Sequence, residues 1–122
     1  MSLVCRGLRG ATTAEANTKE AIIEATTELL SELVQANSID LNMVAAAFLT
    51  TTQDLNAEFP AVAARKAGWN EIALLCGHEM AVPGSMEKCI RVLILLNTEK
   101  KASEMVNLYL RNAKNLRSHG VD

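Results

Sequence analysis

Residues 89–96 (CIRVLILL) form the run that most constrains the fold, because Arg91 is its only charged member. Apolar residues on both faces of a strand are typical of the interior of a sheet. A buried arginine keeps its charge, so Arg91 requires an acceptor such as a carboxylate. Glu79 follows a second strand of similar character and is a candidate acceptor. These residues alone favour a structural Glu79–Arg91 ion pair, and a functional role would need further arginines at the same place.

The first helix is the most strongly predicted element. Apolar residues recur at helical spacing from Ile22 to Val34, while Asn17 and Glu20 fit a helix N-cap and capping box. Four glutamates at four-residue intervals form a row on this helix that we expect to face water: Glu20, Glu24, Glu28 and Glu32.

The remaining pattern alternates strands with helices. We expect residues 3–13 to form a strand that runs into a glycine-hinged turn, and we expect strands over residues 71–76 and 89–96. Helices are expected over residues 59–67 and 103–110. Residues 44–52 are compatible with either structure. The pattern predicts an α+β (mixed α/β) fold, with one mixed β-sheet packed by helices on one face, in a single domain spanning residues 1–122.

Composition excludes several classes of protein. A net charge of −2 and 3% aromatic residues argue against a dedicated nucleic-acid binder. The chain has no apolar run long enough to span a bilayer and no signal segment, and its three cysteines lack zinc-site spacing. We therefore expect a cytoplasmic protein. A chain of 122 residues leaves little room for a deep private cavity, so a sizeable ligand site would need a partner chain.

The polar residues suit anion binding better than acid–base catalysis. For the two histidines, His78 and His119, structural or solvated roles are favoured, and neither a Ser-His-Asp set nor paired carboxylates are evident. What remains is a few arginines and one acid. Arg6 and Arg9 lie three residues apart on a strand and point to opposite faces, so at most one of them can join Arg91.

Eight short blocks, in a fixed order along nearly the whole chain, carry a family resemblance. They are residues 6–13 (RGLRGATT), 54–61 (DLNAEFPA), 64–65 (AR), 68–69 (GW), 76–80 (CGHEM), 88–92 (KCIRV), 109–110 (YL) and 116–117 (LR). These blocks resemble the monofunctional chorismate mutases of the trimeric α/β-barrel type. The spacings from Glu79 to Arg91 and from Arg91 to Tyr109 agree as well. Mainly on this resemblance, we assign residues 44–52 to a strand.

The resemblance implies the Claisen rearrangement of chorismate to prephenate in aromatic amino-acid biosynthesis, without metal or cofactor, at clefts between the subunits of a pseudo-barrel homotrimer. Arg91 would stabilise the negative charge that grows on the ether oxygen. Glu79, assisted by Cys76, would accept a hydrogen bond from the ring hydroxyl. Arg9 and Tyr109 would bind a substrate carboxylate. Further implied substrate-binding residues line the walls or the mouth of the cleft, or close over it from the C-terminal tail of the chain. They are Phe59, Ala61, Arg65, Leu74, Leu75, Leu116 and Arg117.

Two departures from the family pattern keep other hypotheses open. Val62 stands where the family has a lysine, and Leu75 where it has a small hydroxyl residue. A trimer that binds a small dicarboxylate without converting it would fit these residues. An imine-hydrolysing trimer ranks last, because no residue is clearly suited to activate water. A pericyclic reaction moves no proton, which agrees with the lack of a candidate base.

Overall fold

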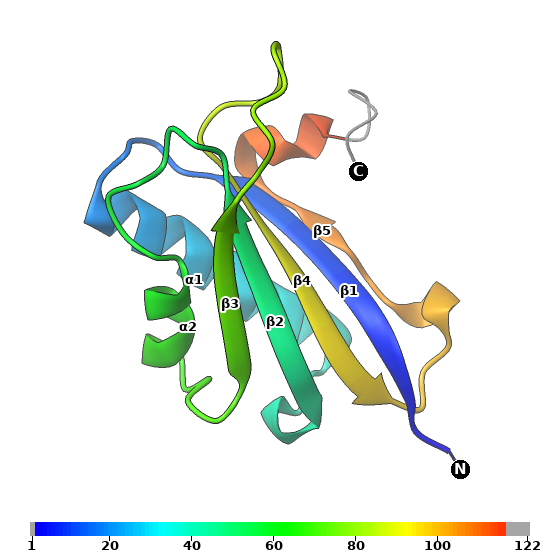
Figure 1. Cartoon of the computed structure of the whole chain (residues 1–122). Coiled ribbons are helices and arrows are strands. Elements are labelled where there is room, and N and C mark those ends of the chain that lie inside the picture. The colour runs from blue at the N-terminus through cyan, green and yellow to red at the C-terminus, as the bar shows by residue number, and fades with distance from the viewer. Residues whose placement is uncertain (1, 117–122) are drawn as a thin grey trace.

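The computed structural model describes residues 2–116 and contains one mixed sheet. Its five strands lie in the order β3-β2-β4-β1-β5 (Figure 1). Strand β4 pairs antiparallel with both β1 and β2, whereas β2 pairs parallel with β3 and β1 pairs parallel with β5. The strands are β1 (Val4–Thr13), β2 (Val44–Thr51), β3 (Ala73–His78), β4 (Cys89–Thr98) and β5 (Leu108–Tyr109).

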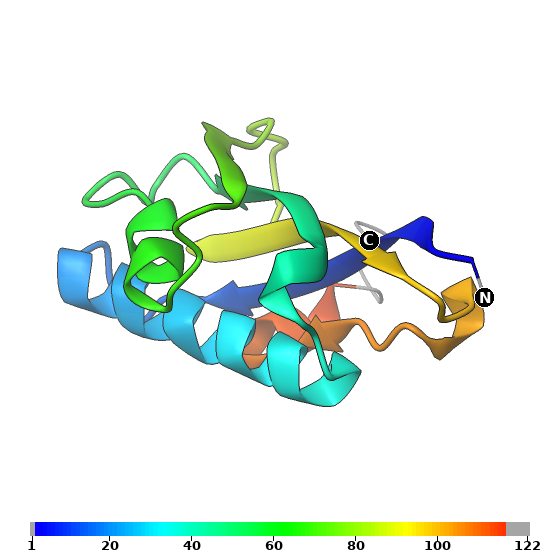
Figure 2. The ribbon, with the colours of Figure 1, turned by 90° about the horizontal axis from the view of Figure 1, so that it is seen from below.

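Two helices pack against the sheet. Helix α1 (Lys19–Asn37) runs along one face of the sheet, and α2 (Ala61–Lys66) connects β2 to β3 (Figure 2). Three short 3-10 turns complete the described chain, at Leu41–Met43, Ala102–Glu104 and Arg111–Asn115. The predicted fold class, a mixed sheet packed by helices on one face, is confirmed. Within residues 2–116 no helix has both the length and the apolar character needed to cross a membrane.

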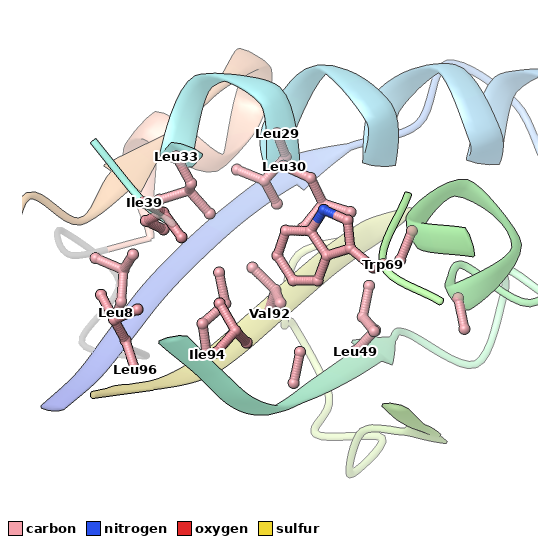
Figure 3. Close-up of a cluster of buried hydrophobic side chains, with 14 residues drawn as sticks. Leu8, Leu29, Leu30, Leu33, Ile39, Leu49, Trp69, Val92, Ile94 and Leu96 are labelled. Carbon is pink, nitrogen blue, oxygen red and sulfur yellow. The ribbon is translucent and has the colours of Figure 1, made fainter. Parts of the chain in front are cut away.

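The main core lies between α1 and the sheet (Figure 3). Leu29 and Leu33 of α1 meet Leu8 of β1 and Val92 of β4, and the indole of Trp69 fills the space beside them. Helix and sheet approach closely because β1 carries Gly10 at the contact. A β-carbon at Gly10 would lie 2.7 Å from a terminal methyl carbon of Leu33.

Strand β4 is central, as its apolar run predicts, but only one of its faces is fully covered within the chain. Ile90, Val92 and Ile94 are buried against the helices. On the opposite face Leu93 is 38% exposed. The apolar run predicts a strand that is covered on both faces. In the single chain, the second face of β4 is partly open. We call this second face the open face; in Figure 1 the viewer looks onto it, with α1 behind.

The predicted N-cap of α1 is wrong by one residue. Thr18 is the N-cap, and its hydroxyl accepts a hydrogen bond from the backbone N–H of Ala21. Asn17 is engaged elsewhere, because its side-chain oxygen accepts the backbone N–H groups of Asn56 and Ala57. Its amide thus orders the loop after β2 and is not available to the helix.

The predicted helix over residues 103–110 is also wrong. A single 3-10 turn at Ala102–Glu104 is followed by extended chain and by β5. Long-range hydrogen bonds hold this segment: Asn37 exchanges two bonds with the backbone of Val106, and the backbone N–H of Arg9 donates to Asn107. These partners lie about seventy or more residues away in the chain, so local helix propensity does not decide the conformation.

The row of glutamates on α1 was expected to face water, but part of it contacts Arg111. Glu20, Glu24 and Glu32 are exposed, but Glu28 is half-buried. The side chain of Arg111 lies 3.0 Å from Glu28 and 3.7 Å from Glu24, measured between charged atoms. This cation reduces the repulsion within the row and ties the C-terminal turn to α1.

Candidate active site

One row of residues crosses all five strands on the open face. In the strand register, Gly77 of β3 is beside Thr50 of β2, Thr50 beside Arg91 of β4, Arg91 beside Ala11 of β1, and Ala11 beside Tyr109 of β5. Residues directly opposite each other in a sheet project to the same face. The sheet therefore carries a threonine, an arginine and a tyrosine into one line, separated from α1 by the core.

Arg91 forms the ion pair that its apolar surroundings predict. Its Nε donates to Glu79 Oε2 at 2.7 Å and its Nη2 donates to Glu79 Oε1 at 2.8 Å. Two parallel bonds of this kind fix the plane of the guanidinium. The two side chains are only 29% and 16% exposed, so the pair is neither fully buried nor a mobile surface contact.

Glu79 is held at its backbone as well as at its carboxylate. It follows β3, and its N–H donates to the carbonyl oxygen of Thr51 at 2.9 Å. The side-chain amide of Gln53 donates to its carbonyl oxygen at 3.3 Å. On the carboxylate, the Thr50 hydroxyl donates to Oε2 at 2.7 Å. The end of β2 therefore fixes where this acid lies.

A pocket of about 670 Å³ opens beside the ion pair. Glu79, Arg91 and Thr50 form one side of it. The loop that joins β3 to β4 forms another, with the exposed side chains of Met80 and Val82. Leu116, which follows the C-terminal turn, closes a third side. That turn and the β3–β4 loop lie at the same end of the sheet (Figure 1).

Arg9 and Tyr109 lie on the same face as Arg91. Arg9 is opposite Leu93, two residues along β4 from Arg91, and is half-buried. Tyr109 packs in the small apolar cluster formed by Ala11, Cys89, Ala113 and Leu116. By contrast, the Arg6 side chain donates to the carbonyl oxygen of Lys100. The expectation that at most one of Arg6 and Arg9 joins Arg91 thus agrees with the strand geometry.

The other sequence-predicted residues are not beside Arg91 within one chain. Phe59 and Cys76 line a separate pocket of about 300 Å³, and Phe59 is 67% exposed. Ala61 and Leu74 belong to the core on the helix side, where Cys76 also packs. Arg65 is exposed on α2, and Leu75 is exposed on edge strand β3. Phe59 and Cys76 thus line a different pocket from Arg91, although His78 lines both pockets, and Arg117 lies outside the described residues.

Comparison with known proteins assigns the family. The model of the family "Chorismate mutase type I" matches residues 5–119. The chain belongs to the type I chorismate mutase family. It is 46% identical over 113 residues to chorismate mutase AroH of Thermus thermophilus, covering 92% of this chain and 93% of that protein. It is 37% identical over 116 residues to chorismate mutase AroH of Bacillus subtilis, covering 94% and 91%.

A solved structure gives the same assignment for the fold. The chorismate mutase from Clostridium thermocellum superimposes with a TM-score of 0.87 at 44% identity, and the match covers 88% of this chain and 96% of that one. The resemblance carried by the eight sequence blocks is confirmed. Membership of the family gives the chain chorismate mutase activity, which is that of an isomerase.

Within this chorismate mutase, sequence reasoning missed Thr50 and the apolar residues of the β3–β4 loop. Threonine is a common strand residue, so nothing in the sequence marks Thr50 as different from Thr51 or Thr52. The antiparallel register that places Thr50 beside Arg91 is a tertiary property. His78, for which a structural or solvated role was favoured, has its Nε2 3.1 Å from the carbonyl oxygen of Leu55 and also lines the 670 Å³ pocket.

Proposed function

We propose that this chain rearranges chorismate to prephenate at a cleft that is completed by a neighbouring subunit of a homotrimer in the cytoplasm, without a cofactor. The observation that carries the proposal is the Arg91 guanidinium, fixed on the open face by two hydrogen bonds to Glu79. A fixed, positively charged donor is what the charge distribution of this reaction requires.

The reaction breaks the ether C–O bond and forms a C–C bond in one pericyclic step. No proton is transferred, so the protein has two tasks: to hold the substrate in its compact conformer and to stabilise charge on the ether oxygen. A guanidinium has five N–H donors, and two of those of Arg91 donate to Glu79. We assign Arg91 to the ether oxygen and one carboxylate of the substrate. Glu79 accepts the hydrogen bond of the ring hydroxyl.

Arg9 and Tyr109 are assigned to a substrate carboxylate. Both lie on the face of Arg91: Tyr109 is two strands away in the same row, and Arg9 is a diagonal neighbour, roughly 7–8 Å from Arg91 between α-carbons. Chorismate carries two carboxylates, and this face offers them two arginine cations and one tyrosine hydroxyl. Leu116 supplies an apolar wall of the same pocket.

The trimer is proposed because predicted site residues line two different pockets of one chain. Phe59 and Cys76 line one pocket, whereas Arg91 and Glu79 line another. A neighbouring subunit that brings its Phe59 and Cys76 groups to the Arg91 pocket would complete the site. The open face supports this, because Phe48, Leu75 and Leu93 are 37%, 62% and 38% exposed there, and large exposed apolar patches mark interfaces. Arg65 is assigned to the mouth of that cleft, and the role of Arg117, which lies outside the described residues, stays a prediction of the resemblance.

The proposed cytoplasmic location is supported by the free cysteine thiols. Cys5 is exposed and Cys76 is half-buried, and neither forms a disulfide. Thiols of this kind persist in a reducing compartment.

The test is the loss of chorismate absorbance on adding the protein, with prephenate identified as the product. Light scattering should give the mass of three chains. The rate should be nearly constant across neutral pH, because arginine does not titrate there. Saturable chorismate binding without prephenate would instead support the non-converting dicarboxylate binder, and a bell-shaped pH profile would point to acid–base chemistry.

A further inference from the structure

We propose that Thr50 is a positioning residue that selects which oxygen of Glu79 receives the ring hydroxyl of the substrate. The inference rests on the proposed function, since it assigns a task to a group beside Glu79. It comes from a hydrogen bond that the proposed chemistry does not use: the Thr50 hydroxyl donates to Glu79 Oε2 at 2.7 Å.

The two carboxylate oxygens of Glu79 are not equivalent. Oε2 accepts two hydrogen bonds, from Arg91 Nε and from the Thr50 hydroxyl, each at 2.7 Å. Oε1 accepts one, from Arg91 Nη2 at 2.8 Å. A carboxylate oxygen has two lone-pair directions. Oε2 is therefore saturated, and Oε1 has one direction left for a further donor.

Arg91 alone would not create this difference. Its two bonds to Glu79 are nearly equal in length, one to each oxygen. Only the Thr50 hydroxyl distinguishes the oxygens, because it bonds to Oε2 and is the remaining donor to this carboxylate among the described residues. Without it, each oxygen would offer one lone-pair direction, and a ring hydroxyl could be accepted at two positions.

The fold places Thr50 rigidly for this role. Thr50 is beside Arg91 in the β2–β4 register, and it lines the same 670 Å³ pocket. The backbone of Glu79 is fixed by Thr51 and Gln53, so only its side-chain torsions remain to be restrained. The Thr50 hydroxyl restrains these torsions by its hydrogen bond to Oε2, and the substrate hydroxyl is left with Oε1.

A functional role and a merely structural one make different predictions for two substrates. If Thr50 directs the ring hydroxyl to Oε1, its loss should impair chorismate but not an analogue in which hydrogen replaces the ring hydroxyl. If Thr50 only supports the fold, both compounds should be impaired alike. The ratio of the two kcat/KM values is therefore the informative quantity, because it is independent of the fraction of folded protein.

The experiment compares three variants with the parent trimer. Thr50→Val removes the hydroxyl at nearly constant shape, and Thr50→Ser keeps it. Thr12→Val is the matched control, because Thr12 is a buried strand residue on the helix side whose hydroxyl has no hydrogen-bond partner among the described residues. We expect Thr50→Val to lower kcat/KM for chorismate about tenfold, through a hydrogen bond to a charged group. Its value for the analogue should change less than about twofold on the same reasoning.

Thr50→Ser should restore the parent ratio, and Thr12→Val should leave it unchanged. An equal loss on both compounds, or no loss on chorismate, would overturn the role of Thr50. If the parent chain converts neither compound, the proposed function fails. The Thr50 inference is then tested separately by calorimetry, which compares the ratio of the two binding affinities between the parent chain and Thr50→Val. An affinity ratio that Thr50→Val leaves unchanged would overturn it there too.

Discussion

Replacing Arg91 with alanine should reduce turnover far more than it reduces stability. A rate enhancement of ~10⁶ corresponds to about 8 kcal/mol of transition-state stabilisation. Removal of one preorganised donor to a developing oxyanion costs about 3–4 kcal/mol. Arg91 donates two hydrogen bonds to Glu79, so its orientation is set before the substrate binds. We therefore expect Arg91→Ala to lower kcat by ~10²- to 10³-fold.

The same substitution leaves Glu79 without its counter-ion. Breaking a fully buried ion pair costs about 3–5 kcal/mol. Here the two side chains are 29% and 16% exposed, and water can enter the 670 Å³ pocket, so we expect a smaller cost. About 1–2 kcal/mol is a reasonable magnitude for this half-exposed pair.

A double variant separates the two effects. Arg91→Ala combined with Glu79→Ala removes both charges, so the stability lost in the single variant should largely return while turnover stays low. The assays are chorismate absorbance for turnover and thermal denaturation at fixed protein concentration for stability, with the mass in solution as a control. The reasoning fails if Arg91→Ala turns over within about tenfold of the parent, or if the double variant recovers activity.

Three further substitutions test the fold around the site. Gly10→Ala should cost about 1–3 kcal/mol in chemical denaturation, because its β-carbon would lie 2.7 Å from Leu33; an unchanged midpoint would contradict the close approach. In the proposed trimer, Leu93→Lys should yield folded monomers by light scattering, because Leu93 is 38% exposed on the open face; an oligomer unchanged by the substitution would place the interface elsewhere. Arg111 has a φ of +53°, a conformation that glycine adopts more readily than alanine. Arg111→Gly should therefore be more stable than Arg111→Ala by about 1 kcal/mol, since both variants lose the bond to Glu28. Equal stabilities would show that this conformation is not strained.

Elements that depend on local pattern were predictable from the sequence. Helix α1 follows from its apolar spacing, and β4 follows from its run of strand residues. Strand β1 was predicted as well, but it continues to Thr13 where a glycine-hinged turn was expected. The assignment of β2 is confirmed, but it needed the family resemblance because Ala45–Ala47 favour a helix. Its place between β3 and β4 in the sheet explains why strand wins there.

Elements that depend on distant partners were not predictable. The segment after β4 was expected to be helical, and it is instead held extended by Asn37, Arg9 and the edge of β1. Asn17 looked like a helix cap, but loop backbone groups from residues 56 and 57 compete for its oxygen. In both cases the deciding hydrogen bonds join residues that are far apart in the chain.

The sequence by itself determined that Arg91 lies in a central strand and needs an acceptor, because an arginine keeps its charge among apolar neighbours. It also offered Glu79 as a candidate acceptor, and the ion pair is present. Only the tertiary structure decided which face of β4 carries that pair and what lies beside it. The register of β2 against β4 brings Thr50 to Glu79, and the helices cover the opposite face. The physical reason is that side-chain alternation fixes two faces, while strand pairing and packing decide which of them is left open.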